Sequence, residues 1–244
     1  MNNELLLKPH SVHLWRVFMP DLLSQVESLS RVLNVEERQR AERFHFDEHR
    51  NRFIIARALL RKILDLYTNT PAEDIQFEKG ERGKPYLKNN RFNLQFNLSH
   101  SHDLAVYAFT NEIEIGIDIE KIKTKFNEEV AKRFFSADEY TALSALPLAE
   151  QIRAFYQIWA GKEAVIKALG AGLYAPLDKF TLKLTQKIQR VNLIHQQHDM
   201  NYHLQNFFTH VDYQSAFATA QSVEEIQYCE WKKEGPMLFL DRFG

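Results

Sequence analysis

The sequence has little of several features that mark specialised classes of protein. It carries one cysteine, Cys229, which excludes a disulfide within the chain and fits a reducing compartment. Its 31 basic and 32 acidic side chains leave a net charge of −1, which gives no global case for binding nucleic acid or a membrane. No apolar run is long enough to span a membrane, and residues 1–10 lack the basic and apolar segments of a signal peptide. We therefore expect a cytoplasmic protein.

The chain does have ample material for a hydrophobic core. Of its 244 residues, 45% are hydrophobic and 26% are charged, which is an ordinary composition for a folded protein. This length fits one large domain or two small ones.

The chain is organised around residues 113–120, where isoleucine occupies every second position. A period of two predicts a strand with isoleucines on one face and with Gly116, Asp118 and Glu120 on the other. Two carboxylates about 4 Å apart repel by roughly 4 kcal/mol at an effective dielectric near 20, so protonation, a cation or a metal must relieve them. Oxygen ligands without paired His or Cys favour magnesium over zinc. A solvated outer face of an edge strand explains the two acids equally well.

A basic helical region precedes this strand. Residues 35–67 have helical periodicity, broken near Phe46-Asp47, and carry several arginines: Arg50, Arg52, Arg57 and Arg61. Guanidinium groups beside an apolar stripe can clamp phosphates, because their planar forks match phosphate oxygens. A solvated charged face accounts for the same pattern.

Two further segments before residue 113 carry polar side chains. The glycine-rich segment Gly80–Tyr86 predicts a loop in which Lys84, before Pro85, is extended. The alternating segment Phe92–Ser99 predicts a strand that ends in Ser99-His100. These two side chains point to opposite faces, so the dipeptide alone is not a nucleophile with its base.

Acidic and basic side chains also recur in the second half. Ser136 and Glu139 have the spacing of a capping box, which accounts for Glu139 as well as a catalytic role does. Residues 151–169 predict the strongest helix, on which Glu163 and Lys167 are four residues apart and share a face. They form either a surface ion pair or part of a site.

The two halves of the chain resemble each other weakly. Arg43–Glu48 is similar to Arg133–Glu139, and each precedes a long helix and then a glycine-rich turn. We interpret this as a duplicated α+β unit, with subdomains at 1–118 and 119–244 and a cleft between them.

Several ordered motifs together resemble one family. They are Gly83-Lys84-Pro85, Phe96-Asn97-Leu98-Ser99-His100-Ser101, Gly116-Ile117-Asp118-Ile119-Glu120, Arg133-Phe134-Phe135-Ser136 with Glu139, and the helix from Trp159 through Lys162-Glu163-Ala164 and Lys167 to Gly170, Gly172 and Leu173. This set resembles the 4'-phosphopantetheinyl transferases of the Sfp type. The likeness covers most of the chain and is weakest over its last 60 residues.

The resemblance implies a fold, an activity and partners. Such enzymes transfer phosphopantetheine from coenzyme A to a serine of an acyl or peptidyl carrier protein, require Mg²⁺, and release adenosine 3',5'-bisphosphate. Their fold is a pseudo-twofold arrangement of two similar α+β subdomains with coenzyme A in the cleft, and a monomer is sufficient. A non-catalytic coenzyme A-binding module of the same fold is the alternative, and it predicts damage to the acids or to Lys167. An unrelated magnesium-dependent phosphotransferase would not need the ordered motifs.

The resemblance also implies roles for individual residues. Asp118, Glu120 and Glu163 would hold the metal. Coenzyme A would contact the following residues: Arg52, Lys84, Pro85, Ser99, His100, Asp118 and Lys167. The candidate catalytic residues are Glu163 as preferred base, Glu139 as its competitor, Lys167 beside the leaving phosphate, and His100.

One segment departs from the family's pattern. The family often has lysines before the Arg-Phe step, whereas Glu36-Glu37-Arg38-Gln39-Arg40 is mixed in sign. The sequence therefore leaves open which of Arg38 and Arg40 contacts coenzyme A. The basic segment Ile122–Phe135 is a candidate dock for an acidic helix of the carrier, and it is also compatible with ordinary surface.

Overall fold

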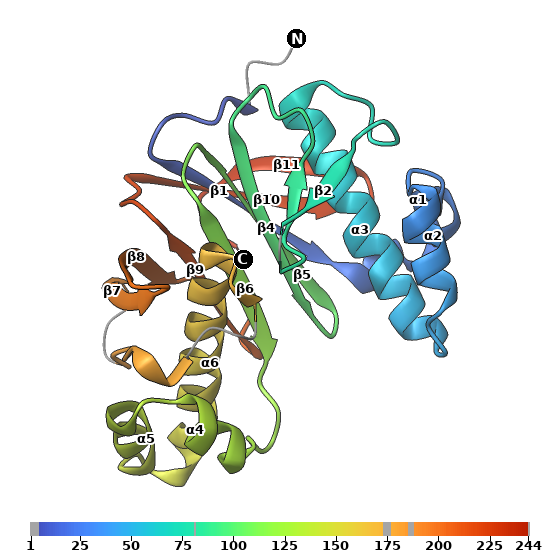
Figure 1. Ribbon diagram of the computed structural model, residues 1–244. Helices are drawn as coiled ribbons and strands as arrows, with labels where there is room; N and C mark the ends of the chain where they lie inside the picture. The colour runs from blue at the N-terminus through green and yellow to red at the C-terminus, as the bar shows by residue number, and fades with distance from the viewer. Residues whose placement is uncertain (1–4, 81, 173–176, 185–187, 244) are drawn as a thin grey trace.

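The computed structural model describes residues 5–80, 82–172, 177–184 and 188–243, so Glu81 and Leu173 of the motifs above lie outside it. It has a five-stranded sheet in the order β11-β10-β1-β5-β4 and a four-stranded sheet in the order β6-β9-β8-β7 (Figure 1). The first sheet contains β1 (Ser11–Phe18), β4 (Leu94–Ser101), β5 (Leu104–Asn111), β10 (Glu225–Lys232) and β11 (Gly235–Leu240). The second contains β6 (Ile115–Lys121), β7 (Ile188–His195), β8 (His198–Asn206) and β9 (Tyr213–Thr219).

Each sheet packs against one helix of 22 residues. Helix α3 (Asp47–Thr68) covers the first sheet and α6 (Leu148–Leu169) covers the second (Figure 1). The remaining elements are α1 (Val26–Ser30), α2 (Val35–Glu42), α4 (Glu128–Phe134), α5 (Ala137–Ser144), 3-10 turns at Met19–Gln25 and Leu177–Lys179, and a hairpin of β2 (Phe77–Lys79) and β3 (Pro85–Leu87). The predicted α+β class with two similarly built halves is confirmed, as is the helix break before Asp47. None of the helices in the described residues is long and apolar enough to cross a membrane.

Both faces of β6 are buried, and this decides where its acids point. The isoleucines of β6 pack against the other face of the first sheet, together with Val12 and Val106. Gly116 lies directly under α6, and Asp118 is only 4% exposed. The solvated-edge interpretation of the acids is therefore wrong, because their face is covered by a helix.

The division of the chain differs from the boundary expected at residue 118. That residue lies inside β6, and the last strands of the chain return to the first sheet, where β10 pairs in parallel with β1. The first subdomain is thus completed by residues 225–240, which the sequence pattern assigned to the second. The reason is tertiary: β1 leaves one edge for a partner, and the C-terminal strand pair supplies it.

We expect Gly116→Ala to destabilise the protein strongly. A Cβ at this position would overlap the carbonyl oxygen of Ala164 and the amide nitrogen of Ala168, and helix backbone cannot move aside locally. The overpacking should cost about 3 kcal/mol or more of unfolding free energy, measured by urea denaturation. Gly161→Ala is the matched control, because its Cβ would meet only the flexible ends of Leu182 and Leu204. Equal stability losses in the two variants would contradict this view of the α6–β6 contact.

We also expect a histidine to contribute to acid lability. His13 is fully buried with its Nδ1 2.8 Å from the Tyr67 hydroxyl, and burial lowers its pKa from 6.5 to about 4. Because the unfolded chain binds this proton first, the stabilisation is complete above pH 6.5 and is lost as pH falls toward 4. The loss at about pH 5 is on the order of 2 kcal/mol. Unfolding free energy should fall less steeply with acid in His13→Gln, and an unchanged slope would refute the assignment.

Candidate active site

Strands β4 and β6 belong to different sheets but lie side by side, joined by side-chain hydrogen bonds. The side-chain Oδ1 of Asn97 accepts from the backbone amide of Ile117 at 3.1 Å, and the Ser101 hydroxyl accepts from the backbone amide of Lys121 at 3.1 Å. These bonds fix the register between the two strands. They bring the polar end of one strand beside the acidic end of the other.

Asp118 is the centre of this contact. Its Oδ1 accepts from the Ser99 hydroxyl at 2.8 Å and from Lys167 Nζ at 2.6 Å, and the same ammonium also donates to Ser99 Oγ at 2.9 Å. Its Oδ2 is buried and has no hydrogen-bond partner among the described residues. The carboxylate is thus held firmly by one oxygen, and the other remains available as a ligand.

The other two predicted metal ligands are coupled to Asp118. Burial, and then the charge of Asp118, raise the pKa of Glu120 to about 7, while a hydrogen bond from Ser101 at 3.2 Å partly offsets the shift. Burial, and then Asp118, also raise the pKa of Glu163, with Lys167 opposing. Lys167 therefore relieves only part of the repulsion between the acids, and the structure brings all three into one electrostatic unit.

The donor set suits a hard divalent cation. No group of three His, Cys, Asp or Glu side chains in the described part of the chain is already gathered closely enough to hold a metal ion. The chemistry nevertheless matches, because Asp118 Oδ2 has no hydrogen-bond partner in the described part of the chain and the ligand atoms are all carboxylate oxygens. Two of the three acids also have raised pKa values that a bound cation would lower. Asp118, Glu120 and Glu163 are therefore the residues that could hold Mg²⁺.

A cleft of about 540 Å³ leads away from this centre. Four of the predicted coenzyme-binding or catalytic residues line it, namely Pro85, Ser99, His100 and Lys167. Its far wall is basic and comes from α2, α3 and the β2–β3 hairpin, with Arg40, Arg43, Arg57 and Lys79 beside Glu36 and Glu37. A cleft with a carboxylate centre at one end and cations along its wall can bind a metal-associated polyphosphate.

Three predicted coenzyme-binding residues, Arg52, Lys84 and Asp118, are not among the residues that line this cleft. Asp118 binds Ser99 and Lys167, which do line it. Arg52 donates to Asp103 Oδ1 at 2.8 Å and lies 2.6 Å from Glu48, so its charge is already paired. Lys84 Nζ donates to the backbone oxygens of Ile115 at 3.0 Å and Ala168 at 3.3 Å, and burial lowers its pKa to about 8. Lys84 therefore ties the loop before β3 to β6 and to the end of α6.

Glu139 has different partners from the three acids of the candidate metal site. Its side chain is fully buried, lies 2.8 Å from Lys162 Nζ, and accepts from the amides of Ser136 at 2.7 Å and Leu182 at 2.7 Å. Lys162 in turn donates to carbonyl oxygens of the segment after α6. The predicted capping box is confirmed, and with both oxygens occupied Glu139 has a structural environment and no free oxygen for a substrate proton.

Arg38 and Arg40 differ in their contacts. Arg38 donates to the carbonyl oxygen of Leu33, which leaves Arg40 as the cleft residue of the two. His100 is exposed at the cleft, and loss of hydration together with the charges of Lys167 and Arg52 lowers its pKa. Sequence reasoning missed Arg43 and Arg57 as individual cleft residues, because periodicity does not separate them from other arginines of the basic region.

Comparisons with known proteins give the family. The model of the 4'-phosphopantetheinyl transferase superfamily matches residues 114–220, and that of the 4'-phosphopantetheinyl transferase N-terminal region matches residues 18–112. The 4'-phosphopantetheinyl transferase HetI of Nostoc is 41% identical over 186 residues, covering 75% of this chain and 78% of the relative. The 4'-phosphopantetheinyl transferase Sfp of Bacillus subtilis is 37% identical over 175 residues, covering 71% and 77%. For psf-1 of Bacillus pumilus, which has the same description, the identity is 39% over 162 residues, with coverage of 66% and 68%. On this evidence the chain belongs to the 4'-phosphopantetheinyl transferases, as its motifs indicated.

Proposed function

We propose that the basic cleft binds coenzyme A and that Asp118, Glu120 and Glu163 hold Mg²⁺ at its end. The chain then transfers the 4'-phosphopantetheine group to a serine of an apo acyl or peptidyl carrier protein and releases adenosine 3',5'-bisphosphate. The observation that carries this proposal is the position of Asp118, which is bound by Lys167 on one oxygen and coupled to Glu120 and Glu163.

The chain's own residues supply orientation and proton transfer. A bound Mg²⁺ would neutralise charge on the diphosphate as the phosphorus–oxygen bond to the nucleotide breaks. Lys167 donates to Asp118 and can also donate to the leaving phosphate of coenzyme A. Glu163 is our candidate for the base that accepts the proton of the attacking serine hydroxyl.

A second groove is our candidate site for the carrier protein. It has a volume of about 610 Å³ and lies between residues 124–128, α5 and the start of α6. Its apolar lining includes Phe126, Leu143 and Leu148, of which Leu148 is 76% exposed. Lys125 lines the groove, and Lys121 and Lys123 precede it in the chain, so an acidic amphipathic helix has complementary chemistry there.

The non-catalytic alternative is disfavoured. A module that only bound coenzyme A would not need the three acids, and it predicts loss of the acids or of Lys167. This chain retains all four side chains, and they lie in one connected unit. The curated relatives above are also described as transferases.

The deciding assay is incubation with coenzyme A, Mg²⁺ and an apo carrier protein, followed by intact mass measurement of the carrier. We expect a gain of one phosphopantetheine group, lost when the divalent cation is chelated and restored when Mg²⁺ is added in excess. Asp118→Ala should abolish turnover while weakening coenzyme A binding less, because it removes a ligand and leaves the basic wall. Absence of a mass gain with acyl and peptidyl carriers alike would refute the proposal.

The base is identified by comparing glutamine substitutions at Glu163 and Glu139. Glu163→Gln should lower kcat by about 100-fold or more, as expected for loss of a general base, with little change in stability. Glu139→Gln should instead lower the unfolding free energy by about 3 kcal/mol, because it leaves Lys162 unpaired in the core. Glu150→Gln, an exposed change on the same helix as Glu163, is the control. A folded Glu139→Gln enzyme with the larger fall in kcat would reverse the assignment.

A further inference from the structure

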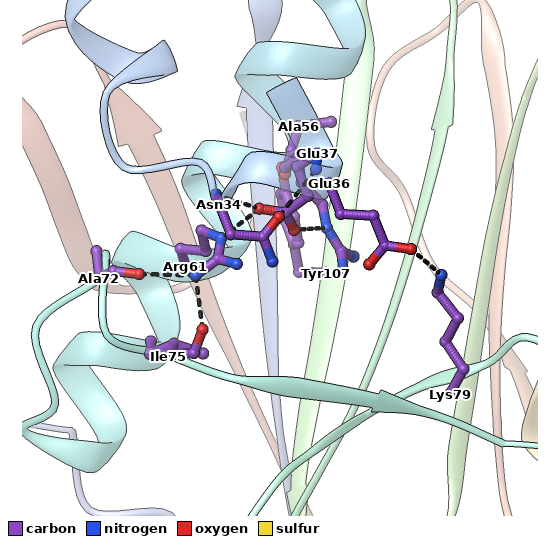
Figure 2. A network of polar contacts seen from close by, with 10 residues as sticks. Asn34, Glu36, Glu37, Ala56, Arg61, Ala72, Ile75, Lys79 and Tyr107 are labelled. Atoms are coloured by element: carbon purple, nitrogen blue, oxygen red, sulfur yellow. Dashed lines mark hydrogen bonds and ion pairs between the residues drawn. The ribbon is translucent and has the colours of Figure 1, made fainter. Parts of the chain in front are cut away.

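A buried carboxylate joins helix α2 to helix α3 at the basic wall of the cleft. Glu37, with a side chain only 8% exposed, accepts from Arg57 Nε at 2.5 Å on one oxygen and from Arg61 Nε at 2.7 Å on the other. Its second oxygen also accepts from the Asn34 amide at 3.0 Å, which closes the capping box of α2 (Figure 2). One acid therefore satisfies a helix cap and two arginines at once.

The two arginines differ in what the rest of each guanidinium does. Arg61 is fully buried, and its Nη1 donates to the carbonyl oxygens of Ala72 at 3.0 Å and Ile75 at 2.7 Å (Figure 2). Those bonds hold the turn after α3, so the role of Arg61 is structural. Arg57 retains 19% of its side-chain exposure and lines the cleft, whereas Arg61 does not.

Arg57 is held on one edge and on one face. Glu37 binds its Nε, and the ring of Phe77 lies 4.4 Å from its central carbon. Within the described residues, no hydrogen bond is formed by the Nη atoms of Arg57, so two donor groups remain for a ligand. A guanidinium fixed in this way presents its remaining fork to an anion with little loss of conformational freedom.

The surroundings of Arg57 select the ligand's chemistry. The same cleft is lined by Arg40, Arg43 and Lys79, and the single charge of Glu37 is shared by Arg57 and Arg61, which leaves one net positive charge there. Glu36, which also lines the cleft, is paired with Lys79 at 2.9 Å (Figure 2). The group that fits beside Arg57 is a phosphate.

We propose that Arg57 binds a phosphate of coenzyme A and that Glu37 is the residue that positions it. This inference rests on the proposed function, because it assigns coenzyme A to the cleft. Arg57 acts directly on the ligand, whereas Glu37 acts through Arg57. Arg61 is the second contact that keeps the carboxylate of Glu37 in place.

The test compares KM and kcat for coenzyme A, and its dissociation constant measured by calorimetry without a carrier protein. Arg57→Gln should raise KM and the dissociation constant about tenfold, with kcat within about twofold. Arg57→Lys should be intermediate, because it keeps the charge and loses the planar fork. Arg50→Gln is the matched control: it removes one charge from the same helix at an exposed residue that does not line the cleft, and should change neither constant.

Glu37→Gln separates positioning from simple support of the fold. It keeps the charge of Arg57 but loosens its orientation, so KM should rise at a temperature where the variant is folded. In the double variant Glu37→Gln with Arg57→Gln, KM should be no higher than in Arg57→Gln alone. If the two effects on KM instead multiply, Glu37 does not act through Arg57 and the positioning role is wrong. Should Glu37→Gln fail to fold, the Arg57 variants still decide whether Arg57 binds the ligand.

Dephospho-coenzyme A then shows which phosphate is bound. A penalty of Arg57→Gln that disappears with this analogue assigns the 3'-phosphate, and a penalty that persists assigns the diphosphate; either supports the proposal. Unchanged KM and dissociation constant in Arg57→Gln, with an active wild-type enzyme, overturn the proposal and leave the function intact. A wild-type chain that binds no coenzyme A overturns both.

Discussion

The close contact of α6 with β6 at Gly116 is the constraint on which the site depends. The absence of a side chain there lets the backbone of the helix rest against the strand at Ala164 and Ala168. Glu163 and Lys167 lie on the same stretch of helix, and Asp118 lies two residues further along the strand. The separation between helix and strand therefore sets whether Lys167 can reach Asp118 at 2.6 Å. A larger residue at 116 would move the acids of the two elements apart.

Two groups of buried charged side chains differ in how completely their charges are neutralised. The pair of Lys162 and Glu139 is enclosed and fully hydrogen-bonded, so it supports the segment after α6 and is isolated from substrate. The charge of Lys167 opposes only part of the repulsion among Asp118, Glu120 and Glu163, and the pKa values of Glu120 and Glu163 stay raised. Incomplete neutralisation distinguishes the candidate site from the structural pair.

At the basic wall of the cleft, positive charge is in excess and one acid balances part of it. Glu37 binds two arginines one turn apart on α3 and offsets part of their mutual repulsion, which leaves one net positive charge. Arg61 uses its Nη1 on two backbone oxygens, whereas Arg57 keeps donors at the cleft. The mixed sequence of α2 is therefore compatible with an anion site, because its buried acid organises cations supplied by the neighbouring helix.

Local patterns in the sequence determined the secondary structure of the chain and the identity of its most informative residues. Period-two alternation located β4 and β6, the spacing of Ser136 and Glu139 located a helix cap, and the ordered motifs named Asp118, Glu120, Glu163 and Lys167. Only the tertiary structure decided that β10 and β11 complete the first sheet, that Lys84 and Arg52 are already paired, and that Glu139 faces Lys162. The physical reason is that periodicity records which face of an element is apolar. The partner of a charged side chain depends on contacts between residues far apart in the chain, such as Arg57 with Glu37 and Lys167 with Asp118.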